Sequence, residues 1–188
     1  MTEVIGRWSQ SKVWYLEDRT RKVLTRSYLS LGSNIGDRAA NLRDAITRLR
    51  TLGEVTAVSS LYETEPIEVT SQPWFLNCAI ALDTELSAEA LLDGILTIER
   101  DMGRRRGLDK GPRNIDIDIL LFGDAVISLP NLDIPHPAMH QRRFVLEPLA
   151  EIAPTVKHPV LNRTVKELRG ALPMGEQLVR IANHSAME

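Results

Sequence analysis

Cysteine is nearly absent from the sequence: Cys78 is the single one in 188 residues. One cysteine excludes an intramolecular disulfide framework and a zinc site built from cysteines, and it is typical of a reducing compartment. Long apolar runs are absent too, since none approaches the roughly 20 residues that a membrane-spanning helix needs. The first 22 residues scatter charges through every window and so lack the apolar stretch of a secretory signal. We therefore expect a cytoplasmic protein that does not bind a membrane.

The chain carries little excess charge of either sign. Its formal net charge is -2 at pH 7 and its pI is about 6.1, so no overall field draws it to nucleic acid. We expect no nucleic-acid partner, and any polyanion must be bound by a local basic cluster. Hydrophobic residues make up 43% of the sequence and charged residues 26%, as in a globular protein with a real core.

Two common nucleotide-binding motifs are missing. The chain contains no G-x-x-x-x-G-K-[ST], because the segment 32–37 lacks both the lysine and the spacing, and it contains no G-x-G-x-x-G. Any nucleotide must therefore be bound without these glycine-rich devices.

Charge and periodicity divide the chain into three parts. Residues 1–26 hold six Lys or Arg against three Asp or Glu and show no clear period, so we interpret them as an extension outside the domain. A docking or packing helix over 13–24 is the alternative. The compact domain is expected over 27–172 and a C-terminal tail over 173–188, because this length suits one domain with a short appendage.

Hydrophobic periodicity predicts the elements of the domain. Alternation and β-branched residues indicate strands, and apolar residues at helical spacing indicate helices. In chain order we expect a strand at 27–32, a helix at about 38–52 capped by Asn34 or Asp37, strands at 54–63 and 75–84, a helix capped by Ser87, and a strand at 114–123.

This order of elements is that of a ferredoxin-like split βαβ unit. We therefore expect an α+β fold in which an extended antiparallel sheet carries flanking helices on one face. Gly123 and Asp124 are predicted to turn the chain into a hairpin partner at 125–129, which widens the sheet. Shorter helices are expected near 138–149 and 164–169.

Asp116 and Asp118 are the first candidates for chemistry. Residues two apart in a strand share a face, so both carboxylates point the same way with Cβ atoms roughly 7 Å apart; Ile115, Ile117 and Ile119 fill the other face. Two such anions repel unless a cation lies between them or one is protonated. Mg²⁺ prefers one or two carboxylates together with substrate phosphates. The alternatives are a solvent-facing pair and a pair neutralised by arginine.

A basic loop at 103–113 comes directly before this acidic strand. It contains Arg104, Arg105, Arg106, Lys110 and Arg113. The planar fork of arginine matches phosphate oxygens, and the glycines of the loop leave it free to close over a substrate. A solvated basic turn is the alternative. Together, the loop and the acidic pair favour nucleotide chemistry, because they are the parts that hold a polyphosphate and stabilise its charge.

Phe75 and Asn77 share the other candidate surface, on one face of the strand at 75–84. An aromatic ring can stack on a flat heterocycle and an amide can read its polar edge, although an isolated Phe on a strand is more often part of the core. Glu99 at the end of a helix either pairs with a loop arginine or faces the site. His136 lies between two prolines, whose rigidity could aim the imidazole at a phosphate; a plain loop histidine is the alternative.

The motifs resemble one family. LSLGSNIGD, SSLYETEP, the FLN strand, GRRR, GPRNIDIDILLFG, IPHP and RRFVLEPLAEIAP occur in this order over about 27–172. This succession is similar to that of the 6-hydroxymethyl-7,8-dihydropterin pyrophosphokinases of the folate pathway. GPRNIDIDILLFG followed by PHP at this distance is highly specific.

The resemblance implies a reaction and a set of roles. It implies attack by the 6-hydroxymethyl oxygen of the pterin on the β-phosphorus of ATP, with release of AMP. Asp116 and Asp118 would ligate two Mg²⁺ ions that bridge the ATP phosphates. The other residues on the nucleotide side would be Glu99, Arg104, Arg106, Arg113, Ile119, His136 and Arg142. The pterin would lie between Phe75 and Phe144, with its pyrimidine edge read by Asn77, Thr64 and Ile67.

The expected partner is thus a small pterin, bound by a monomer that could dock on, or be fused to, a neighbouring enzyme of the folate pathway. Two other readings stay open. One is a different D-x-D, two-metal nucleotidyl or phosphoryl transferase. The other is a ferredoxin-like RNA-binding module that uses the basic loop, although two aspartates on its sheet would repel a phosphate backbone.

Overall fold

The protein is described here by a computed structural model. It describes residues 23–66, 72–104 and 111–173, and the backbone of 178–181. The predicted site residues Ile67 and Arg106, together with Lys110 and the segment 1–22, lie outside these ranges. Within them, no helix is long and apolar enough to span a bilayer.

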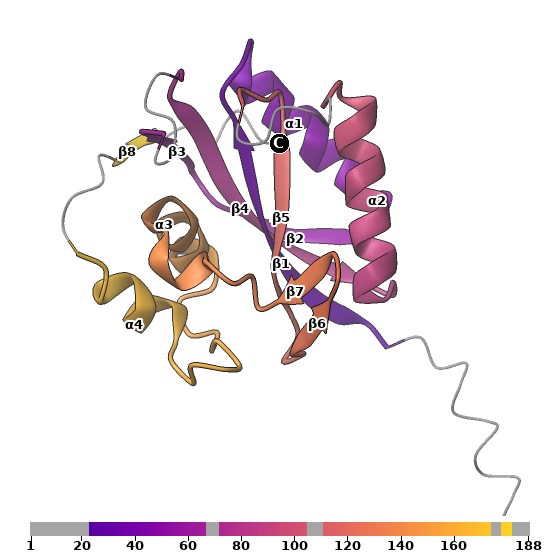
Figure 1. Cartoon of the computed structure of the whole chain (residues 1–188), viewed down its shortest axis with the longest axis vertical. Helices are drawn as coiled ribbons and strands as arrows, with labels where there is room; N and C mark the ends of the chain where they lie inside the picture. The colour runs from indigo at the N-terminus through magenta and orange to yellow at the C-terminus, as the bar shows by residue number, and fades with distance from the viewer. Residues whose placement is uncertain (1–22, 67–71, 105–110, 174–177, 182–188) are drawn as a thin grey trace, which may run out of the picture.

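One antiparallel sheet of six strands forms the centre of the molecule (Figure 1). Its order is β5 (Asp116–Phe122), β1 (Thr25–Ser33), β4 (Phe75–Thr84), β3 (Leu61–Thr64) and β8 (Leu178–Ile181), and β2 (Glu54–Val58) pairs with β4. All neighbouring strands are antiparallel. The expected mixed α/β architecture with an antiparallel sheet is therefore confirmed.

Helices α1 (Arg38–Leu49) and α2 (Ala88–Asp101) cover one face of this sheet (Figure 1). The alternation of each strand decides which side chains meet them. Leu29 and Leu31 of β1 are fully buried in this cluster, and Ile117 of β5 joins them. Cys78 lies in the same cluster, where burial raises the pKa of its thiol to about 12, so it remains a protonated core residue.

The opposite face is covered as well, so the expectation of helices on one face only was wrong. A short 3-10 helix (Met139–Gln141), α3 (Arg143–Ile152) and α4 (Val165–Gly170) form a second cluster there. Leu146 and Leu149 of α3 are fully buried in it beside Leu120 of β5. The helix was expected from its sequence, but the apolar residues that receive it are spread over several strands.

Three helices begin with a side-chain cap formed between residues three positions apart. Asp37 accepts from the Ala40 N–H at 2.9 Å, Ser87 accepts from the Ala90 N–H at 3.2 Å, and Thr164 forms a capping box with Glu167. Each side chain satisfies an amide that the first helical turn leaves without a partner. The predicted caps Asp37 and Ser87 are confirmed, and Asn34 has a different role.

Two strand predictions differ from the structure. The expected strand at 54–63 is divided into β2 and β3, because the Ser60 N–H and hydroxyl both donate to Glu151 of α3. The expected hairpin partner of β5 instead forms β6 (Ile127–Leu129), which pairs with β7 (Leu132–Ile134) in a separate two-stranded sheet. Leu132 and Ile134 bury their side chains in the core. This burial fixes the position of β7, and β6 pairs with β7 rather than with β5.

The main sheet is widened at the edge opposite β5, beyond β3. Residues 178–181, from the segment predicted to be a C-terminal tail, form β8 and pair with β3. This part of the segment therefore belongs to the sheet.

We predict that Gly53→Ala destabilises the fold. A Cβ at this position would lie 2.3 Å from the backbone carbonyl oxygen of Asp83 in β4, so the strand must shift. The expected loss in the free energy of unfolding is about 1–3 kcal/mol, measured by urea denaturation. Gly170→Ala is the matched control, because nothing lies within 4 Å of its added Cβ. An equal loss in both variants would contradict the steric explanation.

Candidate functional site

A pocket of about 560 Å³ lies on the face of the sheet that carries α3. Strands β1, β3, β4 and β5 contribute to it, as do the chain before β5 and the segment that leads into α3. Its lining comprises Ser30, Gly32, Thr64, Glu65, Pro66, Gln72, Phe75, Asn77, Arg104, Arg113, Asp116, Asp118, His136, Ala138, Gln141, Arg142 and Phe144.

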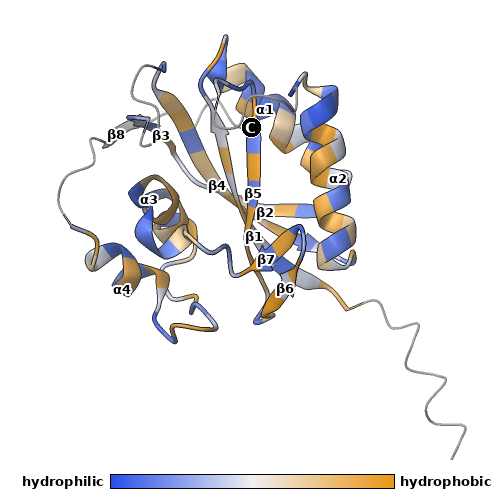
Figure 2. Cartoon of the chain, in the orientation of Figure 1, coloured by the Kyte–Doolittle hydropathy of each residue, from blue (hydrophilic) through white to orange (hydrophobic). Residues whose placement is uncertain are grey.

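The strand register builds the floor of the pocket. Gly32 of β1 is paired with Asp116 of β5 on one side and with Asn77 of β4 on the other. Ser30 is likewise paired with Asp118 on the β5 side. Because these residues share one face, the two carboxylates and the carboxamide are presented together, separated by a strand with small side chains. Hydrophilic and apolar residues alternate in the first half of β5, over residues 116–119 (Figure 2).

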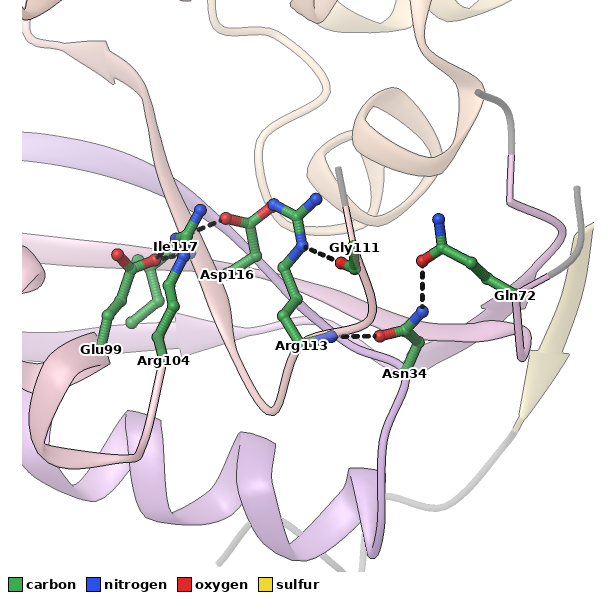
Figure 3. A network of polar contacts seen from close by, with 8 residues as sticks. All are labelled: Asn34, Gln72, Glu99, Arg104, Gly111, Arg113, Asp116 and Ile117. Carbon is green, nitrogen blue, oxygen red and sulfur yellow. Dashed lines mark hydrogen bonds and ion pairs between the residues drawn. The ribbon is translucent and has the colours of Figure 1, made fainter. Parts of the chain in front are cut away.

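Arginine neutralises Asp116 in this structure. Its two carboxylate oxygens accept from Arg104 at 2.6 Å and from Arg113 at 2.8 Å (Figure 3). Arg104 also donates to Glu99, which is 3% exposed at the end of α2. Burial lowers the pKa of Arg104, but the carboxylates of Asp116 and Glu99 outweigh it and raise the pKa above its ordinary value. Arg104 therefore stays charged beside the acidic strand.

Glu99 lies behind Arg104. Its carboxylate accepts from the Ile117 N–H at 2.8 Å as well as from Arg104, so it joins the end of α2 to β5. Burial raises the pKa of Glu99, against the opposing effect of Arg104. The side chain is not part of the lining of the pocket, and it contacts the lining residue Arg104 from behind.

Asp118 is the less compensated of the two acids. Asp116 has two arginine partners. Among the described residues, no hydrogen bond or ion pair of comparable length holds the carboxylate of Asp118. Burial raises the pKa of Asp118, and the nearby charge of Asp116 raises it further. A carboxylate in this position gains stability from any cation that enters the pocket.

His136 faces the acids from the other wall. Its Nδ1 accepts from the Ala138 N–H at 3.2 Å, so in the neutral ring the proton is on Nε2. Burial lowers the pKa of His136, which favours this neutral form, although Asp118 opposes the shift. The histidine can thus donate one hydrogen bond from Nε2.

The residues fit a magnesium site that substrate completes. The described part of the chain contains no group of three or more His, Cys, Asp or Glu arranged to hold a metal. Mg²⁺ commonly takes only one or two protein carboxylates and fills its other positions with water and phosphate oxygens. Asp116 and Asp118 supply that donor set, provided that Arg104 and Arg113 release Asp116.

The other end of the pocket is aromatic. Phe75 and Phe144 both line it, and the Arg142 guanidinium lies 5.7 Å from the Phe144 ring centroid. The Asn77 amide, which is 3% exposed, donates to the Thr64 hydroxyl at 2.7 Å. Gly32 leaves room for this amide, because a Cβ there would lie 2.7 Å from Asn77 Oδ1.

Most of the predicted site residues meet in this pocket. The lining includes Thr64, Phe75, Asn77, Arg104, Arg113, Asp116, Asp118, His136, Arg142 and Phe144. Ile119 does not join them, because its side chain is 5% exposed and buried in the cluster under α1 and α2; its assignment to the nucleotide stays a prediction. Ile67 and Arg106 lie outside the described residues.

Sequence reasoning missed Asn34. It was expected, as an alternative to Asp37, to cap the following helix, but Asp37 has that role. Asn34 instead bonds to Arg113 at 2.8 Å and to Gln72 at 3.1 Å (Figure 3). The sequence did contain a signal: a helix start needs one cap, and the presence of both Asn34 and Asp37 left one of them for another role.

Comparison with known proteins gives a consistent result. The family model for 7,8-dihydro-6-hydroxymethylpterin-pyrophosphokinase (HPPK) matches residues 28–154. A Methylorubrum extorquens protein, 2-amino-4-hydroxy-6-hydroxymethyldihydropteridine pyrophosphokinase, is 47% identical over 83% of this chain and 99% of its own length. The Dictyostelium discoideum folic acid synthesis protein FOL1 is 40% identical over 82% of this chain, which spans 23% of that longer protein.

A solved structure shows the same fold. The crystal structure of Plasmodium falciparum HPPK-DHPS with STZ-DHP superposes with a TM-score of 0.66 at 19% identity, over 81% of this chain and 46% of that one. The family match extends from β1 through α3 and thus contains every element that builds the described pocket. The chain therefore belongs to the 7,8-dihydro-6-hydroxymethylpterin-pyrophosphokinase (HPPK) family.

Proposed function

We propose that this protein transfers the β,γ-diphosphate of ATP to the 6-hydroxymethyl group of a 7,8-dihydropterin in folate synthesis, giving AMP and the pterin diphosphate. Family membership and the name of the Methylorubrum relative support this reaction. The observation that carries it is the division of one pocket into two ends. One end has two carboxylates and two arginines, and the other has two phenylalanines and a fixed amide.

The charged end suits a nucleotide phosphate chain. Two Mg²⁺ ions, when held by Asp116 and Asp118 and by ATP, would supply positive charge that stabilises the diphosphate during transfer. Arg104 and Arg113 hold Asp116 in the free protein and are placed to turn their remaining N–H groups to phosphate oxygens. The Glu99 contact restrains Arg104 during this exchange. His136 Nε2 can donate to a further phosphate oxygen.

The aromatic end suits a flat heterocycle. The rings of Phe75 and Phe144 would stack on the two sides of a pterin. One N–H of the Asn77 amide is engaged by Thr64, which fixes the plane of the amide. Asn77 Oδ1 can then accept from an N–H on the pterin edge. Arg142, beside Phe144, would lie between the pterin and the nucleotide.

Several finer assignments belong to the same proposal. The order of β5, β1 and β4, with β2 and β3 beside β4, supports the ferredoxin-like interpretation. We propose a catalytic domain at 27–172, to whose sheet Thr25 and Arg26 of β1 and the strand β8 also belong. We further propose that the residues before β1 form an extension and that the protein is cytoplasmic. We also propose that the protein acts as a monomer. The Plasmodium falciparum protein is named HPPK-DHPS, so HPPK is combined there with a second component. We therefore propose that this protein docks on a neighbouring enzyme of the folate pathway.

Product identification tests the reaction. Purified protein with ATP, Mg²⁺ and 6-hydroxymethyl-7,8-dihydropterin should release AMP and the diphosphorylated pterin in equal amounts, measured by chromatography. Formation of ADP or free pyrophosphate in place of AMP would instead indicate another two-metal transferase. A control without pterin should yield no AMP.

We predict that Asp118→Asn lowers kcat at least 100-fold, or about 2.7 kcal/mol of transition-state stabilisation. The amide is similar in size but loses the charge that attracts Mg²⁺. Steady-state kinetics measure the effect, and circular dichroism checks the fold. Asp124→Asn, in the exposed turn that follows the same strand, is the matched control and should retain kcat within twofold. Near-normal turnover of Asp118→Asn would remove this carboxylate from the proposed metal site.

We predict that Phe144→Ala weakens pterin binding at least tenfold, or about 1.4 kcal/mol, because one stacking surface is lost. The affinity for a non-hydrolysable ATP analogue with Mg²⁺ should change less than threefold. Isothermal titration calorimetry measures both. Phe122→Ala is the control, since Phe122 packs against the core rather than the pocket. Equal losses for the two ligands would argue against a stacking role for Phe144.

A further inference from the structure

Asn34 lies between the two ends of the pocket. It follows the last residue of β1 and is 1% exposed. Its backbone and side chain form hydrogen bonds with two segments that are distant from it in sequence, and these segments serve opposite ends of the site. Figure 3 shows this arrangement, with Asn34 between Arg113 and Gln72.

The first set of contacts fixes the backbone of Arg113. The Asn34 N–H donates to the Arg113 carbonyl at 3.2 Å, and the Arg113 N–H donates to Asn34 Oδ1 at 2.8 Å. With both of its peptide groups held, Arg113 extends its guanidinium to Asp116 at 2.8 Å. Asn34 therefore sets the starting point of one of the two arginines at the charged end.

The second set of contacts fixes the chain that enters β4. Asn34 Nδ2 donates to Gln72 Oε1 at 3.1 Å and to the Pro73 carbonyl at 3.4 Å. Gln72 lines the pocket, and Phe75, the stacking residue at the aromatic end, follows two residues after Pro73. Asn34 thus holds the approach to the pterin end.

The orientation of the Asn34 amide follows from its partners. The Arg113 N–H is only a donor and the Pro73 carbonyl is only an acceptor, so Oδ1 must face Arg113 and Nδ2 must face residues 72–73. An amide is the side chain of this size that offers both groups. A carboxylate in its place would keep the acceptor and lose the donor.

A purely local role does not account for these contacts. Asp37 caps α1, and Asn41 supports the turn between β1 and α1 by donating to the Ser33 hydroxyl at 3.2 Å and the Ile35 carbonyl at 2.9 Å. The side chain of Asn34 contributes hydrogen bonds to neither. Its side-chain hydrogen bonds to the described residues connect the turn to the two ends of the pocket.

We propose that Asn34 is a positioning residue that couples nucleotide binding to pterin binding. A ligand that orders Arg113 at the charged end also orders residues 72–75 through one shared amide, and the reverse holds by thermodynamic linkage. This inference rests on the proposed function, because it assumes that the two ends bind the two substrates.

The test is a thermodynamic cycle measured by isothermal titration calorimetry. The affinity for 6-hydroxymethylpterin is measured with and without a saturating non-hydrolysable ATP analogue and Mg²⁺. In the natural protein the nucleotide should tighten pterin binding at least fivefold. In Asn34→Asp this factor should fall below twofold, while the affinity for each ligand alone changes less than threefold. A merely structural role would lower both separate affinities and leave their ratio unchanged.

Asn41→Asp is the matched control, because it removes a donor from the same turn without a bond to either end of the pocket. It should keep the coupling factor. If Asn34→Asp does not fold, Gln72→Met decides, since it removes one of the two acceptors of Nδ2 and should lower the factor at least twofold.

The inference is overturned by an unchanged factor in Asn34→Asp or Gln72→Met, by loss of coupling in Asn41→Asp, or by a natural protein without coupling. The proposed function fails separately, if the natural protein binds neither ligand or releases no AMP.

Discussion

Electrostatic repulsion between Asp116 and Asp118 is the constraint around which the site is arranged. Two unit charges about 7 Å apart repel by about 2.4 kcal/mol at an effective dielectric constant of about 20. The strand tolerates this because Ile117 is buried on its other face and anchors it, and because arginine compensates Asp116. Asp118 has no such partner among the residues described, which leaves the negative potential that the proposed Mg²⁺ would neutralise.

Charges of alternating sign extend from this pair. Glu99, Arg104, Asp116 and Arg113 follow one another in contact, so each charge is stabilised by its neighbour in a partly buried place. In such a row of charges, an arginine can exchange one partner for another without leaving a charge unpaired. In the proposed function, the arginines that hold a carboxylate in the free protein would be positioned for phosphate, and Glu99 would keep one of them in place when the carboxylate turned to the metal.

Local interactions explain why much of the fold could be predicted. Caps such as Asp37 and Ser87 act within three residues, and the faces of β5 follow from alternation alone, so both are readable from short segments. The pairing of β6 was mispredicted because it depends on the position of β7, which is set by the burial of Leu132 and Ile134 in the core. The second layer of helices escaped prediction for a similar reason, since Leu120 and its neighbours form a surface only after the strands are ordered.

The sequence by itself determined the chemistry of this protein: the acidic pair on one strand face, the arginines before it, and the motif order that resembles the family. These are properties of short segments, in which covalent spacing already places the groups. Only the tertiary structure decided which arginine neutralises which acid, that Glu99 lies behind Arg104, and that Asn34 joins Arg113 to Gln72. The Asn34 contacts join residues 79 and 38 positions apart, so they exist only once the sheet has brought these segments together. The arginine and acid partners are closer in sequence, but which of them meet depends on how the end of α2 packs against β5.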